Sequence, residues 1–123
     1  MAPAPQHHTA DDLIPRPERT AGALRAALAR VDPSRLDEMQ RTMDEAFSQA
    51  IDHKSLAPIQ AWLLVWAQNI EIARRVDLRT RHQHAQAVLT SYDKHEHDDE
   101  DAVNKALAEI SAVLDEAQQA VRG

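Results

Sequence analysis

Two pairs of histidines are the residues in this sequence best suited to hold a metal ion. His95 and His97 flank Glu96 in the run DKHEHDDED, and imidazoles beside carboxylates chelate divalent cations such as nickel, zinc or copper. Nothing in this charged run would fix the ligand geometry, so we interpret residues 93–101 as a solvated acidic linker. We therefore predict no metal site and no cofactor.

The second pair, His82 and His84, has a spacing that does not suit a metal on a helix. Metal-binding histidines on a helix prefer a spacing of four, whereas a spacing of two places the rings about 160° apart around the axis. His82 lies on the apolar stripe of its helix, so we expect a half-buried helix–helix contact. Burial would lower its pKa, and protonation at about pH 6 would loosen the packing.

A basic cluster lies in the middle of the chain and consists of Arg74, Arg75, Arg79 and Arg81. It could contact phosphate, or an acidic segment such as 93–101 of its own chain or of a partner. The spacings place these side chains on two different helix faces, which makes a poor surface for reading a nucleic-acid groove. We favour an ordinary solvated helix end, because exposed arginine is common.

Catalytic motifs are absent from the sequence. It has neither a glycine-rich phosphate loop nor a G-x-S-x-G turn. The carboxylate pairs Asp37-Glu38 and Asp44-Glu45 lie on a wet helix face, where they keep ordinary pKa values and have no pocket. Cysteine is also absent, which excludes disulfides and thiolate chemistry and fits a reducing cytoplasm. We expect a cytoplasmic protein that is not an enzyme.

Composition indicates an all-α protein. Hydrophobic residues make up 43% of the 123 residues, aromatic residues only 3%, and there are two glycines, whereas sheets and tight turns need glycine and β-branched or aromatic residues. The longest apolar run, AWLLVWA, is too short to span a membrane, and the N-terminus does not resemble a signal peptide. The net charge of −6 argues against nucleic-acid binding, which needs excess cations.

Apolar spacing predicts a helical bundle of about five helices over residues 20–92 and 102–122, preceded by a disordered N-terminal arm at 1–19. Four of the six prolines lie in the arm, which could also be extended, with Leu13 and Ile14 docked. Thr20, Asp32 and Ser55 are suitable N-caps for the first three helices. The stripe of the second helix is Leu36, Met39, Met43, Phe47, Ala50 and Ile51.

The third helix, after Ser55, is apolar all round in its middle, which is typical of the buried centre of a bundle. Trp62 and Trp66 lie one turn apart on it, and we expect them to form the structural hub. The stripe shifts near Val76–Leu78, so we expect a break there. A fourth helix then follows over about 77–92.

The last helix, 102–122, carries an apolar stripe that we predict to be partner-binding, at Val103, Leu107, Ile110, Leu114 and Val121. It could instead close the bundle. The preceding acidic run and the helix together carry a net charge of −6 over residues 93–123, which would suit a basic partner surface.

Residues 20–76 resemble a group of small actinobacterial helical proteins of unknown function. The shared features are TAGALRAAL, a capped helix with a DEAF segment, and LAPIQAWLLVWA. The resemblance implies a small bacterial cytoplasmic helical domain encoded beside a toxin-like or regulatory partner. It supplies no catalytic residues, and the acidic tail and last helix lie outside it.

We therefore expect a non-enzymatic protein–protein interaction module, of the kind that neutralises a toxin or regulates a partner. It would bind another protein, or its own copy as a homo-oligomer, through amphipathic helical faces and the acidic C-terminal segment. The alternative is a small metal- or ligand-binding helical protein that uses its histidines, at His82, His84, His95 and His97.

Overall fold

The computed structural model describes residues 12–95 and 100–122, and within them the chain forms five α-helices and one 3₁₀ turn but no β-strand. The predicted all-α class is confirmed. The elements are α1 (Ala21–Val31), η2 (Pro33–Arg35), α2 (Leu36–His53), α3 (Ala57–Arg74), α4 (Val76–His95) and α5 (Glu100–Arg122).

Thr20 is the N-cap of α1 as predicted, whereas the N-cap residue of α3 is Leu56, one position after the predicted Ser55. The Thr20 hydroxyl accepts a hydrogen bond from the Ala23 amide at 3.2 Å, and the Ser55 hydroxyl accepts one from the Ala57 amide at 3.1 Å. Asp32 makes no such cap. Its carboxylate accepts from the Ser34 hydroxyl at 2.6 Å instead, and a 3₁₀ turn precedes α2.

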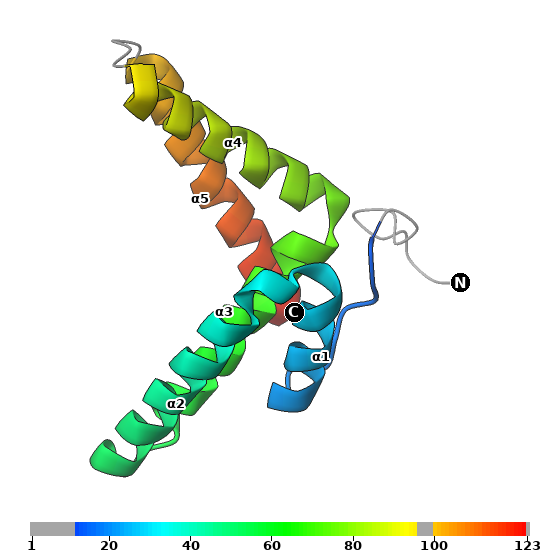
Figure 1. The fold of residues 1–123 in the computed structure, drawn as a ribbon, viewed down its shortest axis with the longest axis vertical. Coiled ribbons are helices and arrows are strands. Elements are labelled where there is room, and N and C mark those ends of the chain that lie inside the picture. Colours follow the sequence, from blue (N-terminus) through cyan, green and yellow to red (C-terminus); the bar gives the residue numbers. More distant parts are fainter. Residues whose placement is uncertain (1–11, 96–99, 123) are drawn as a thin grey trace.

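Two antiparallel helical hairpins, α2–α3 and α4–α5, extend in different directions from a centre where α1 and the C-terminal end of α5 also lie (Figure 1). Helix α3 contacts each of the other four α-helices. Helix α4 packs chiefly against α5 rather than into one four-helix bundle with α1–α3. This arrangement leaves the far end of each hairpin two helices thick.

The first core surrounds the two tryptophans of α3. Both indoles are buried with their ring centroids 6.4 Å apart, and Ile70 and Leu24 beside them are fully buried. The Thr42 hydroxyl of α2 accepts hydrogen bonds from both indole N–H groups, at 3.0 and 3.2 Å. One hydroxyl has two lone pairs, so this single side chain satisfies both buried donors.

The second core joins the end of α3 to the other hairpin and makes α5 part of the fold. Ile72, Leu78, Val113 and Ala117 pack together there, and the last three are completely buried. Val121, near the end of α5, packs against the first core. Of the two alternatives for the last helix, the structure shows that it closes the fold of its own chain.

The break between α3 and α4 lies at Arg75, whose backbone is extended, directly before the predicted stretch Val76–Leu78. An extended segment from residue 12 to residue 19 docks beside this break. The Leu13 amide donates to the Arg74 carbonyl oxygen at 2.7 Å, and Ile14 is buried in the first core. The arm is therefore extended and docked over 12–19, while its residues 1–11 lie outside the described part.

The helix ends narrow the predicted acidic linker. Helix α4 continues to His95 and α5 begins at Glu100, so both enter the range 93–101. Residues 96–99 lie outside the described part. No helix in the described ranges combines the length and the apolar content that crossing a membrane requires.

Candidate functional site

The predicted partner-binding stripe of α5 is divided by the packing of that helix. Small side chains at Ala106 and Ala117 are buried, together with Val113, and this turns part of the stripe outward. Leu107 is 51% exposed and Leu114 is 36% exposed. The other three members, Val103, Ile110 and Val121, are half-buried.

A larger apolar surface lies at the free end of the α2–α3 hairpin. Phe47 is 47% exposed, Ile51 is 75% exposed, and Leu56, in the turn between the helices, is 67% exposed. Phe47 and Ile51 belong to the predicted apolar stripe of the second helix but are left exposed, because no third helix reaches this end of the hairpin (Figure 1). Met39 and Ala46 alone are buried on α2.

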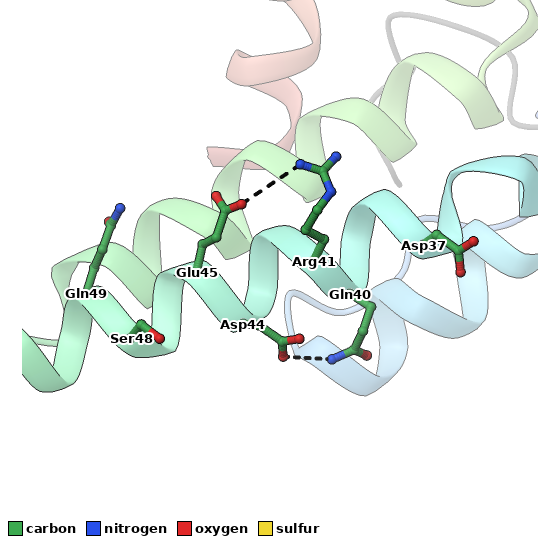
Figure 2. Close-up of a pocket in the computed structure, with 7 residues that line it drawn as sticks. All are labelled: Asp37, Gln40, Arg41, Asp44, Glu45, Ser48 and Gln49. Carbon is green, nitrogen blue, oxygen red and sulfur yellow. Dashed lines mark hydrogen bonds and ion pairs between the residues drawn. The ribbon is translucent and has the colours of Figure 1, made fainter.

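The outer face of α2 is polar and open to solvent, as expected for the wet face. Figure 2 shows seven side chains that all come from this one helix. Arg41 lies 3.9 Å from Glu45, and the Gln40 amide donates to Asp44 at 3.0 Å. These carboxylates face solvent rather than an enclosed pocket, so nothing there organises a substrate.

A buried carboxylate, Glu71, lies where the arm, α3 and α4 meet. Arg16 of the arm donates two hydrogen bonds to it, at 3.0 and 2.8 Å, and Arg74 donates two more, at 2.8 and 3.0 Å. Arg75 comes within 3.5 Å of the same carboxylate. Two guanidinium groups therefore hold one carboxylate in the paired geometry that makes charge-assisted hydrogen bonds strongest.

Further contacts extend this buried ion cluster and balance its charge. Arg74 also donates to Asp12 at 2.9 Å and to the Ile14 carbonyl oxygen at 3.0 Å. Arg75 donates to both carboxylate oxygens of Asp77, at 3.1 and 2.7 Å. The three carboxylates and three guanidiniums together are neutral, which favours the burial of charged groups. The side chains of Arg16 and Asp77, at the edge of the cluster, are 43% and 45% exposed.

Burial by itself would raise the pKa of Glu71, because it disfavours the charged form. Hydrogen bonds from Arg16 and Arg74, and the charges of both, outweigh burial and lower this pKa to about 2. The carboxylate therefore stays ionised in the folded protein at neutral pH.

The favoured prediction of a solvated basic helix end is wrong for Arg74 and Arg75, which are both buried in the ion cluster. Arg81 lies further along the chain, on α4, and forms ion pairs with α5. Its guanidinium is 2.6 Å from both Glu109 and Glu116. The acidic groups that Arg74, Arg75 and Arg81 contact thus come from the chain itself. They are Asp12, Glu71, Asp77, Glu109 and Glu116. Arg79 makes no hydrogen bond or ion pair through its side chain within the described part.

A cleft of about 540 Å³ lies where the end of α1, η2, α3, α4 and α5 meet. Polar side chains supply much of its wall, at Asp32, Arg35, Arg79, His82, Asn69, Gln83 and Gln86. His82 is half-buried as predicted, and its pKa is lowered, first by burial and then by the charge of Arg35.

The histidines weighed as metal ligands lie partly in the described helices. His82 is half-buried and His84 is exposed on α4, while Glu96 and His97 lie outside the described part. Among described residues, no group of three or more histidine, aspartate or glutamate side chains is placed to hold a metal ion.

Comparisons with protein-family models, with curated proteins and with solved structures found no significant match to this chain. The resemblance of residues 20–76 to actinobacterial proteins therefore stays a prediction, and the function has to be argued from the geometry.

Replacing Glu71 by glutamine should lower the free energy of unfolding at pH 7 by about 3–5 kcal/mol, because three guanidiniums would lose their shared charge partner. Urea denaturation followed by the fluorescence of the buried tryptophans measures this. Glu45→Gln, at an exposed pair, is the matched control and should change stability by less than about 0.5 kcal/mol. Equal stabilities for the two variants would show that the buried ion cluster does not hold the fold.

The lowered pKa of Glu71 also predicts how stability depends on pH. Its contribution is fully present above its unfolded pKa and disappears as pH falls toward about 2. Between pH 5 and pH 3 the wild-type protein should lose about 1.5 kcal/mol more stability than Glu71→Gln, since the glutamine has no proton to bind. Urea titrations at these two pH values provide the test, and parallel losses in both proteins would contradict the assignment.

Proposed function

We propose that this protein is a non-enzymatic protein-interaction module of the cytoplasm, and that the free end of its α2–α3 hairpin binds a basic amphipathic helix of another protein. The observation that carries the proposal is the exposure of Phe47, Ile51 and Leu56 at one end of the molecule. Large apolar side chains gathered on a surface favour contact with a macromolecule, because burial removes them from water.

The charges beside these side chains support a basic partner. Asp44 lies three residues before Phe47 and seven before Ile51, so the three share one face of α2. The outer face of this helix carries the carboxylates of Asp37, Asp44 and Glu45 against the single guanidinium of Arg41 (Figure 2). An apolar surface with an acidic border suits a helix that presents leucines flanked by lysine or arginine.

Net charge favours a different protein over a second copy. The whole chain carries −6, so two copies that met at an acidic border would repel each other. A basic helix would gain attraction during its approach instead. The α5 stripe is the second candidate surface, but only Leu107 and Leu114 are well exposed there, and Val121 already packs on the first core.

A synthetic 18-residue peptide with a leucine stripe and a lysine polar face tests the proposal by fluorescence anisotropy. It should bind the wild-type protein more tightly than the same peptide with a glutamate polar face. Ile51→Ser should weaken this binding about tenfold, because an interface loses one buried aliphatic side chain. The matched control, Leu107→Ser, should leave it unchanged.

Other outcomes would reject this assignment. Loss of binding in Leu107→Ser but not in Ile51→Ser would place the interaction on α5. A dimer in solution that Ile51→Ser converts to a monomer would show that a second copy covers the hairpin end. Equal binding of the lysine and glutamate peptides would remove the argument from charge.

A further inference from the structure

The cleft where the end of α1, η2, α3, α4 and α5 meet holds two arginines and a histidine against one carboxylate, that of Asp32, in an otherwise acidic protein. Arg35 enters it from η2, and Arg79 and His82 enter it from α4. Asn69 of α3 and Gln83 and Gln86 of α4 add side-chain amides, which can donate hydrogen bonds. Four of these groups lie on α4, and Arg35 of η2 and Asn69 of α3 line the same cleft, so the donors come from three elements.

The two arginines of the cleft differ in their hydrogen-bond partners. Arg35 is held in place by two hydrogen bonds to Glu38, at 2.9 and 3.2 Å, and its guanidinium carbon lies 4.9 Å from the centre of the Trp66 ring. Arg79 has no hydrogen bond or ion pair through its side chain to any described residue, although it is half-buried. A half-buried guanidinium without a partner keeps all five of its donors available for a ligand.

We propose that this cleft binds a small tetrahedral oxyanion, such as the terminal phosphate of a metabolite, through Arg79 with His82 and the side-chain amides. Guanidinium groups match the oxygens of phosphate and sulfate, and donors on several sides suit a tetrahedral group better than a planar carboxylate. Glu38 neutralises much of the charge of Arg35, so Arg35 serves to orient the wall of the cleft, while Arg79 supplies the attraction.

Protonation of His82 sets the pH dependence of this site. The charged groups that face it are Arg35 and Asp32 from the η2 side and Arg79 from its own helix, while the cleft residues of α3 and α5 are uncharged. A fall in pH adds a proton, and with it a positive charge, to the imidazole. An oxyanion should therefore bind more tightly at pH 5, and its binding should raise the pKa of His82 in return.

Sulfate is the probe of choice, because it keeps both charges between pH 5 and pH 8. We expect a saturable titration at constant ionic strength, with shifts of the His82 ring and the Asn69, Gln83 and Gln86 amide resonances in NMR spectra. Arg79→Gln should weaken sulfate binding about tenfold, as loss of a charged hydrogen-bond donor predicts. Arg41→Gln, at an exposed arginine outside the cleft, should leave it unchanged.

Two further experiments distinguish binding in this cleft from general screening of surface charges by salt. His82→Gln should abolish the tighter binding at pH 5, and inorganic phosphate should compete with sulfate while acetate does so at least about tenfold more weakly. The proposal is overturned if Arg79→Gln and Arg41→Gln respond to sulfate like the wild-type protein, if acetate competes equally, or if the affected resonances lie outside the cleft. Folding of each variant is checked by the amide spectrum before titration.

Discussion

The carboxylate of Glu71 joins three parts of the chain, namely the arm, the C-terminal end of α3 and the start of α4. It lies near the C-terminal end of α3, where the helix dipole disfavours a negative charge, and it is removed from water. Arg16 from the arm and Arg74 from α3 offset both costs through four hydrogen bonds. Removal of either partner type would leave buried charge uncompensated, so the arm, the end of α3 and the start of α4 depend on one another.

Helix α3 can serve both hairpins because neighbouring residues on it face in different directions. Ile70, Glu71 and Ile72 are consecutive and lie about 100° apart around the axis, so they enter the first core, the ion cluster and the second core respectively. The two hairpins thus share one helix and extend apart from it. This geometry leaves the far end of α2–α3 uncovered, and it forms the polar cleft where the elements meet.

Periodicity predicted the helices, the break after α3 and the buried tryptophans, because these depend on local spacing. Periodicity did not predict the ion cluster. A usable signal was nevertheless present, because Glu71 lies between two isoleucines on a helix that is apolar all round, and Arg74 and Arg75 follow one turn later. Its partners Asp12 and Arg16 are distant in sequence and looked like part of a proline-rich arm. The exposure of Phe47 and Ile51 could not be predicted from the sequence either. Apolar spacing identifies one face of α2, but it does not show how much of that face α3 and α1 cover.

Amide hydrogen exchange at Leu13 tests most directly whether Glu71 holds the arm in place. This amide donates to the Arg74 carbonyl oxygen at 2.7 Å, while the Leu24 amide, which donates to Thr20 at 2.9 Å, reports on α1. We predict that Leu13 is protected in the wild-type protein and exchanges rapidly in Glu71→Gln, with Leu24 protected in both. Exchange of Leu13 at the same rate in both proteins would contradict the central role of the buried carboxylate.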